Sequence, residues 1–183
     1  MKPLLTTSLL ALLGLLTFIR AADPAPKVNP KGQVLEFGLL ELIGPQQRVA
    51  NAKTLDGEQQ NAEGARFTEQ TDRIPATPGV LFGFRYKITG VTEQGTAEFK
   101  KVVTHPPIKN EKGEIERQYS TTETLPAKNG YVSEVSGYSL DRPEELVPGV
   151  WTFELWYHGQ KVVSQTFTVY APTDKAPAKA PTK

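Results

Sequence analysis

The chain of 183 residues contains no cysteine. This absence excludes disulfide bonds, a thiolate nucleophile, a cysteine-ligated metal and a lipid-modified cysteine. A domain without disulfides has to be stabilised by its own hydrophobic core, and a chain of this length is long enough to bury one. The length also fits a single domain, since domains commonly hold about 100 to 200 residues.

The chain also has few histidines and almost no net charge. The chain has two histidines and a formal net charge of +1. Proteins that bind nucleic acid need a basic surface for its phosphates, so nucleic acid is not an expected partner. His105 precedes two prolines, which favour extended backbone, and we expect it to be buried or to cap a strand end. His158 has no histidine at metal-site spacing, and we predict neither a metal nor a cofactor.

A nucleophile motif is also missing, because Gly-x-Ser-x-Gly does not occur in the sequence. Acidic residues do gather at Asp141, Glu144 and Glu145. Two carboxylates at a suitable separation, one of them with a raised pKa, can hydrolyse a glycosidic bond. We predict that the protein is not an enzyme, and a small periplasmic hydrolase that uses the acidic turn 141–145 remains the alternative.

The N-terminus carries the pattern of an export signal. Lys2 precedes the apolar run Leu4–Ile19, and small residues follow it. This order is typical of a secretory signal peptide, and the run is shorter than the about 20 apolar residues of an isolated spanning helix. We predict a signal peptide at 1–21 with cleavage after Ala21, a periplasmic or secreted protein, and no transmembrane segment in the mature chain. Retention of the segment as a tether remains open.

Two segments rich in proline, alanine and lysine flank the rest of the chain, at 22–32 and 171–183. Such segments have little apolar surface to offset the entropy lost on ordering. We therefore expect a flexible linker, a domain at 33–170 and a disordered tail. The lysines of the tail leave open a structural role in which the tail contacts an anionic envelope polymer.

Between these ends, apolar residues alternate with polar ones, most clearly at Val80–Thr89 and Val150–Tyr157. Alternation with period two is typical of half-buried antiparallel strands. In the second segment this parity places Trp151 on the predicted core face and Trp156 on the opposite face. The sequence therefore separates its two tryptophans between two environments.

Turn-like pairs separate the other strand candidates. His158–Gly159 predicts a two-residue hairpin turn back into Lys161–Tyr170, because glycine accepts a positive φ. Six weaker strand candidates are Val34–Ile43, Gln47–Lys53, Ala65–Thr71, Thr96–Thr104, Ile115–Thr122 and Val132–Leu140. The expected separators are Gly44–Pro45, Asp56–Gly57, Pro75–Gly79, Asn110–Gly113 and Asn129–Gly130. These patterns predict an all-β, antiparallel, immunoglobulin-like β-sandwich of about eight or nine strands.

Three motifs extend this interpretation to a family. The motifs are Pro75-x3-Gly79-x-x-Phe82-Gly83-Phe84-Arg85-Tyr86, His105-Pro106-Pro107-Ile108 and Glu145-Leu146-Val147-Pro148-Gly149-x-Trp151-Thr152-Phe153-Glu154. In their order and spacing they resemble a bacterial exported family described only as a domain of unknown function. The resemblance implies an immunoglobulin-like fold without an assigned activity, and it transfers no catalytic residue to this chain.

Trp156 is the candidate ligand-binding residue. An exposed aromatic side chain on a sandwich face often serves as a platform for sugars, peptides or a partner's strand. The alternative is that Trp156 is covered, or is one of the many surface apolar side chains without a role. Tyr119, Tyr131 and Tyr138 are candidates for the same surface or for hydrogen-bonded corners at strand ends. We predict a non-catalytic binding or structural module for a protein or glycan partner of the cell envelope, met through a sheet face or an edge strand.

Overall fold

The computed structural model describes residues 29–50, 58–110 and 112–172. The predicted signal peptide, most of the predicted linker and nearly all of the predicted tail lie outside these residues. The expected turn at Asp56–Gly57 lies outside them as well. The first strand begins at Lys31, two residues inside the predicted linker. Within the described ranges, no helix is long and apolar enough to cross a membrane.

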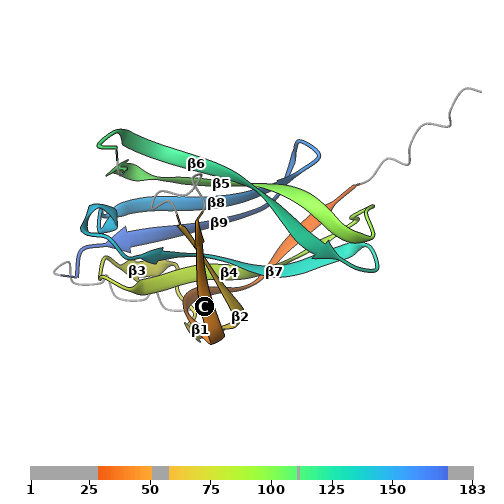
Figure 1. The fold of residues 1–183 in the computed structure, drawn as a ribbon, viewed down its shortest axis with the longest axis horizontal. Coiled ribbons are helices and arrows are strands. Elements are labelled where there is room, and N and C mark those ends of the chain that lie inside the picture. The colour runs from red at the N-terminus through yellow and green to blue at the C-terminus, as the bar shows by residue number, and fades with distance from the viewer. Residues whose placement is uncertain (1–28, 51–57, 111, 173–183) are drawn as a thin grey trace, which may run out of the picture.

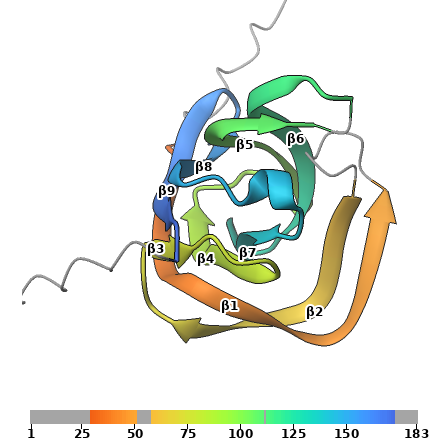
Figure 2. The same cartoon turned by 90° about the vertical axis from the view of Figure 1, so that its left-hand side faces the viewer.

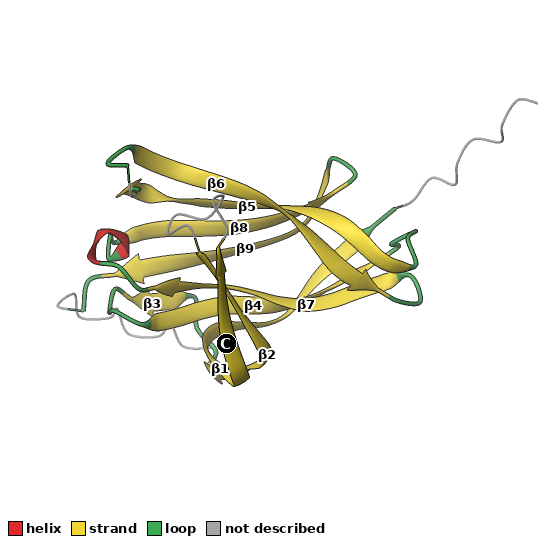
Figure 3. Ribbon diagram, in the orientation of Figure 1, coloured by secondary structure: helices red, strands yellow, loops and turns green. Residues whose placement is uncertain are grey.

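The described chain folds into two packed β-sheets (Figure 1). Its elements are β1 (Lys31–Ala50), β2 (Glu58–Glu69), β3 (Arg73–Pro75), β4 (Val80–Thr89), β5 (Gly95–Lys109), β6 (Ile115–Ala127), β7 (Tyr131–Leu140), the 3-10 helix η1 (Pro143–Glu145), β8 (Gly149–Tyr157) and β9 (Gln160–Tyr170). One sheet has the order β2-β1-β4-β7 and the other β3-β9-β8-β5-β6. Only the pairing of β3 with β9 is parallel among the described strands. Figure 3 shows how little of the described chain lies outside strands, and the predicted all-β sandwich is confirmed.

The core lies between the sheets and follows the predicted parity. Phe82 of β4 faces Trp151 and Phe153 of β8, and all three side chains are 1% exposed or less. The ring of Phe82 meets those two rings and that of Phe167 edge to face, at centroid distances of 5.9, 5.8 and 5.1 Å. Each such pair contributes about 0.5–1.5 kcal/mol beyond the area it buries, so these rings hold the two sheets together.

Two of the predicted turns have the geometry of tight two-residue turns. His158–Gly159 joins β8 to β9 with φ of 47° and 78°, and Asn129–Gly130 joins β6 to β7 with φ of 54° and 76°. Two successive residues with positive φ form the turn whose twist matches that of the flanking strands. The first turn sets the register of β8 with β9, whereas the second carries the chain from one sheet to the other.

The expected separator at Gly44–Pro45 is wrong. β1 continues through it to Ala50, so the predicted strand Val34–Ile43 and the described part of the predicted strand Gln47–Lys53, residues 47–50, belong to one strand. Residues 51–53 lie outside the described residues. The pairing of β1 with β2 shifts register between Ile43 and Gln46. A bulge accommodates glycine and proline inside a long strand, because it relaxes the requirement for a ladder hydrogen bond.

Other boundaries differ because tertiary pairing extends the strands. β2 begins at Glu58 rather than Ala65, although its first residues are polar. β5 continues past its expected end at Thr104 and across Pro106 and Pro107. Its pairing with β6 shifts register at these prolines. The sequence did not predict β3 or η1, because three residues are too few to show a period.

The hairpin of β1 and β2 bends around the side of the sandwich. Figure 2 shows its far part, the arm (residues 40–50 and 58–65), curving away from β4 towards β6. Leu40 at the base of the arm is 5% exposed but lies outside the main core. A Cβ built at Gly137 of β7 would lie 3.0 Å from the carbonyl oxygen of Phe82 and 3.6 Å from Cδ2 of Leu40. A side chain at position 137 would therefore press on the backbone of β4, while Leu40 of the arm lies within ordinary contact distance.

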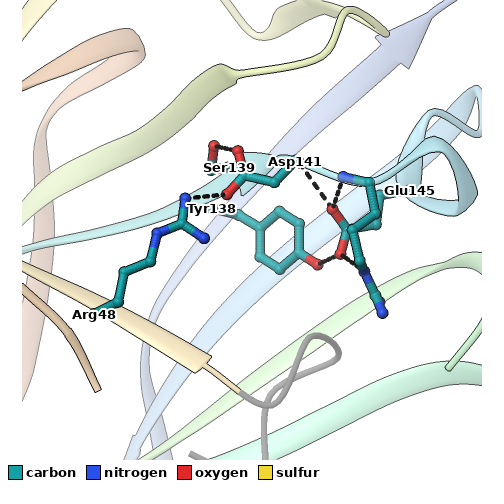
Figure 4. A network of polar contacts seen from close by, with 6 residues as sticks. Arg48, Tyr138, Ser139, Asp141 and Glu145 are labelled. Carbon is teal, nitrogen blue, oxygen red and sulfur yellow. Dashed lines mark hydrogen bonds and ion pairs between the residues drawn. The ribbon is translucent and has the colours of Figure 1, made fainter. Parts of the chain in front are cut away.

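Glu145 fixes the connection from β7 to β8. Its carboxylate is 1% exposed. Oε1 accepts hydrogen bonds from Oη of Tyr138 (2.8 Å) and Nε of Arg142 (3.2 Å), and Oε2 accepts them from the backbone N–H groups of Asp141 (2.9 Å) and Arg142 (3.1 Å), as Figure 4 shows. Tyr138 thus forms a hydrogen-bonded corner of the kind expected from the sequence. The contacts anchor the end of β7.

Replacing Glu145 by alanine tests this anchor. The E145A change leaves a buried hydroxyl, two backbone N–H groups and a guanidinium without their acceptor, so we expect a loss of about 3 kcal/mol in the free energy of unfolding. Urea denaturation measures it. The matched control is E144A, at an exposed neighbour, with an expected change of about 0.5 kcal/mol or less. Equal stability of the two variants would contradict a structural role for Glu145.

Candidate functional site

A cleft of about 720 Å³ lies between the arm and the open side of the sandwich. Residues of β1, β2, β4, β6 and β7 line it, together with Lys101 of β5. Its volume is within the range of about 300–1,000 Å³ that is common for ligand pockets. The cleft is therefore large enough to hold a ligand or a segment of a partner.

The cleft exists because β6 and β7 belong to different sheets. The two strands leave one turn, where Lys128 bridges to Tyr131, and then separate (Figure 1). β6 pairs with β5, whereas β7 pairs with β4 along its whole length. The second edge of β7 has no further partner among the described strands, and it faces the cleft.

The interior of the sandwich becomes polar at this cleft. Nζ of Lys101 on β5 lies 3.1 Å from Oε1 of Glu123 on β6, and their side chains are 14% and 20% exposed. Burial alone would lower the pKa of Lys101, but the charge and the hydrogen bond of Glu123 outweigh burial and hold that pKa above its ordinary value. The lysine therefore stays charged inside the fold.

Two buried hydroxyl groups of the cleft lack a partner. Thr121 of β6 is 7% exposed and Ser136 of β7 is 4% exposed. Neither Oγ1 of Thr121 nor Oγ of Ser136 has a hydrogen-bond partner within the described structure. An unpaired buried hydroxyl costs about 1–3 kcal/mol, and native proteins retain few of them. A polar group that enters the cleft, water or a ligand, can complete these hydrogen bonds.

Glu134 adds a carboxyl group to the same cleft. It lies two residues before Ser136 on the inward side of β7 and is half-buried. No hydrogen bond or ion pair of its side chain is present among the described residues. Burial and the charge of Glu123 raise the pKa of Glu134, and Arg85 offsets only part of this effect. The cleft thus has an acidic group without a counterion of its own.

Trp156 lies outside this cleft. It is half-buried on the outer face of the five-stranded sheet, opposite in parity to Trp151. Its Nε1 donates to Oε2 of Glu154 at 3.1 Å, and Nζ of Lys161 lies 5.9 Å from the ring centroid. Trp156 borders a separate depression of about 690 Å³ together with Val102 of β5. Its role in ligand binding stays a prediction.

The two histidines are not brought together. His105 is 4% exposed, and its Nδ1 lies 2.7 Å from the carbonyl oxygen of Pro106. Burial lowers the pKa of His105, and the hydrogen bond to Pro106 only partly offsets it. His158 is exposed in its turn, with Nε2 3.0 Å from Oε1 of Glu93. The described residues contain no group of three or more side chains suited to a metal ion.

The acidic turn 141–145 is held by contacts within the fold (Figure 4). Oδ2 of Asp141 lies 3.3 Å from a guanidinium nitrogen of Arg48, and Oδ1 accepts a hydrogen bond from Oγ of Ser139 at 2.6 Å. Glu144 is exposed, and the four donors around Glu145 occupy both of its oxygens. This arrangement does not favour the hydrolase hypothesis, because no two free carboxyl groups face each other across the turn.

Of the residues that line the cleft, the sequence singled out Tyr119, Tyr138 and Asp141 but not the polar side chains between them. One signal was available in the predicted strand Val132–Leu140. Its inward positions are apolar near the two ends of the strand, but Glu134 and Ser136 occupy those in the middle. Polar side chains at core-facing positions of a strand indicate either a buried network or a site. The wall formed by β6 around Thr121 carried no comparable signal in the sequence. The strand that faces it across the cleft, β7, belongs to the other sheet.

Removing the two unpaired hydroxyls tests whether they lower stability. We expect the T121V and S136A variants each to raise the free energy of unfolding by about 0.5–1 kcal/mol, since an unsatisfied buried polar group disappears. Chemical denaturation measures the change. The control is T71V: Oγ1 of half-buried Thr71 accepts a hydrogen bond from the N–H of Arg73 at 3.0 Å, and its loss costs about 1 kcal/mol. A similar loss in all three variants would show that the cleft hydroxyls are satisfied within the fold.

Comparisons with known proteins bear on the family and the fold. Residues 28–169 match the family described as Domain of unknown function (DUF3859). An immunoglobulin-like protein from Pseudomonas aeruginosa matches with a TM-score of 0.54 and 19% identity, over 79% of this chain and 99% of that chain. The alkylpurine DNA glycosylase AlkC of Pseudomonas fluorescens matches with a TM-score of 0.35 and 11% identity, over 54% of this chain and 27% of that chain, which supports no argument. No curated protein matches. The family resemblance and the immunoglobulin-like fold predicted from the sequence are confirmed.

Proposed function

The chain belongs to the family described as Domain of unknown function (DUF3859). Since that description names no activity, we propose a function from the site itself. The protein is an exported, non-catalytic module that binds a protein partner of the cell envelope in the cleft under the arm. One observation carries this proposal: the hydroxyls of Thr121 and Ser136 are buried, lack a partner in the described structure and line a cleft of about 720 Å³.

Export is supported by the order of residues at the N-terminus. A basic residue, an apolar run and small residues follow one another before the domain, as in a secretory signal peptide. A periplasmic or secreted protein without disulfides needs a large core, and the ring cluster around Phe82 supplies one. A non-catalytic role is supported by the acidic turn, where the carboxylates of Asp141 and Glu145 are engaged in contacts that hold the fold.

A protein partner is favoured over other polar ligands by the free edge of β7. A strand edge offers backbone N–H and C=O groups in a row, and an extended segment of another protein can pair with them. Side chains next to the edge then select the partner's residues. The cleft combines such an edge with polar side chains that lack partners, which is the combination strand addition needs.

Selection of peptides tests this function. A displayed library of random peptides about ten residues long is panned against the folded chain, and enriched peptides are titrated against it and against the T121V/S136A double variant. We expect enrichment, and binding about tenfold or more weaker to the double variant, because its hydrogen bonds to the peptide are lost. The variant is expected to be at least as stable as the parent, so unfolding does not explain the loss. Absence of enrichment, or equal binding to both proteins, would overturn the proposal.

A second candidate function is glycan binding at Trp156. The observation that favours it is the depression of about 690 Å³ that Trp156 borders on the outer face. We expect the W156A change to weaken co-sedimentation with insoluble peptidoglycan about tenfold, on the scale of losing an aromatic anchor. The matched control is V150A, since Val150 is 57% exposed on the same face of β8 and does not border the depression. Unchanged sedimentation of W156A would dispose of this candidate.

A further inference from the structure

The free edge of β7 is long and regular. Its pairing with β4 runs without a register shift from Leu140 to Tyr131. Natural edge strands are usually protected by proline, lysine, bulges or short length. β7 contains no proline and no lysine, whereas the neighbouring edge strand β6 carries Glu116, Arg117 and Pro126. Of these two edges, that of β7 is therefore the better suited to accept another strand, and Glu134 restricts which strand it accepts.

The inward side chains of β7 define what an added strand would meet. Val132 and Leu140 are fully buried near the two ends, and Glu134 and Ser136 lie between them. Directly opposite residues of paired strands have Cβ atoms about 4.5–5.5 Å apart. An inward side chain on an added strand would consequently lie beside Glu134 and Ser136 and point towards Thr121.

The charges that line the cleft leave a carboxylate in excess. Lys101 is paired with Glu123 at 3.1 Å, and Arg48 is paired with Asp141 at 3.3 Å. Glu134 has no ion pair within the described structure; the charge of Glu123 raises its pKa, and Arg85, whose Nε lies 3.0 Å from Oε2 of Glu36, only partly offsets this. A cationic group in the cleft would offset the repulsion between the two carboxylates. The cleft is thus complementary to a positive charge that also donates hydrogen bonds.

We propose that the partner of this cleft is an extended polypeptide segment that pairs with the free edge of β7 and places a lysine ammonium group among Glu134, Ser136 and Thr121. This inference rests on the proposed function and specifies its ligand. An ammonium group has three N–H donors and no acceptor, which matches one carboxylate and two hydroxyl oxygens. Leu125 also lines the cleft and offers apolar surface to the four-carbon stem of the lysine.

Designed peptides test the strand and the lysine separately. The probes are blocked peptides about nine residues long, of alternating threonine and valine, with lysine, norleucine or glutamate at the centre. A further probe has the lysine sequence with alternate backbone nitrogens methylated, which removes the ladder hydrogen bonds. Binding to the full chain is followed by NMR titration and by amide hydrogen exchange of residues 131–140. We expect the lysine peptide to bind and to slow exchange of the β7 amides, with the other probes about tenfold or more weaker.

The E134Q variant tests the carboxylate. We expect it to bind the lysine peptide about tenfold more weakly and the norleucine peptide no more weakly than the parent does. The matched control is E98Q, because Glu98 is exposed on the outer face of β5 and does not line this cleft. Equal binding of the lysine and norleucine peptides, equal binding of the methylated probe, or an unchanged affinity of E134Q would each overturn the proposal.

Failure of this inference is distinguishable from failure of the proposed function. Should the peptides selected from the random library need the hydroxyls of Thr121 and Ser136 but carry no lysine, the cleft remains a binding site and the lysine inference is wrong. When neither selected nor designed peptides bind in the cleft, both are wrong. A free diamine that binds as tightly as the lysine peptide shows recognition of an amine without strand addition, and that result also overturns the inference.

Discussion

The division of the chain at Asn129–Gly130 is the constraint on which the site depends. β6 enters that turn as a strand of one sheet, and β7 leaves it as a strand of the other. The aromatic contacts of Phe82 with Trp151 and Phe167 keep the two sheets in place, so β6 and β7 cannot approach each other to close the side of the sandwich. The free edge, the cleft and the space that the arm covers all follow from this separation.

The two walls of the cleft differ in rigidity. The end of β7 is fixed by the four hydrogen bonds to the buried carboxylate of Glu145, and its other edge is paired with β4 throughout. The arm is tied to the same region by the ion pair of Arg48 with Asp141, whose side chains are 55% and 27% exposed. An ion pair so exposed contributes about 1 kcal/mol or less. The edge of β7 is therefore held more firmly than the arm that faces it.

The sequence predicts local features of this fold and misses those that depend on pairing. The alternation in Val80–Thr89 and Val150–Tyr157 identifies core faces because a strand with one buried face repeats every two residues. Gly44–Pro45 misleads because a bulge and a turn have the same composition, and only pairing with β2 distinguishes them. Trp156 is singled out as a candidate binding residue because parity places it on the face opposite to Trp151. The cleft escapes notice because Thr121 and Ser136 line it from two different sheets, which no local pattern encodes.

The polar middle of β7 is best understood as a compromise between stability and recognition. Apolar residues at positions 134 and 136 would continue the core that Val132 and Leu140 begin, and would avoid burying groups without partners. A uniformly apolar edge of this length would also accept unrelated strands and aggregate. A carboxylate and hydroxyl groups in the middle make pairing unfavourable unless the incoming strand supplies donors. The same residues that weaken the fold thus select against strands that cannot satisfy them.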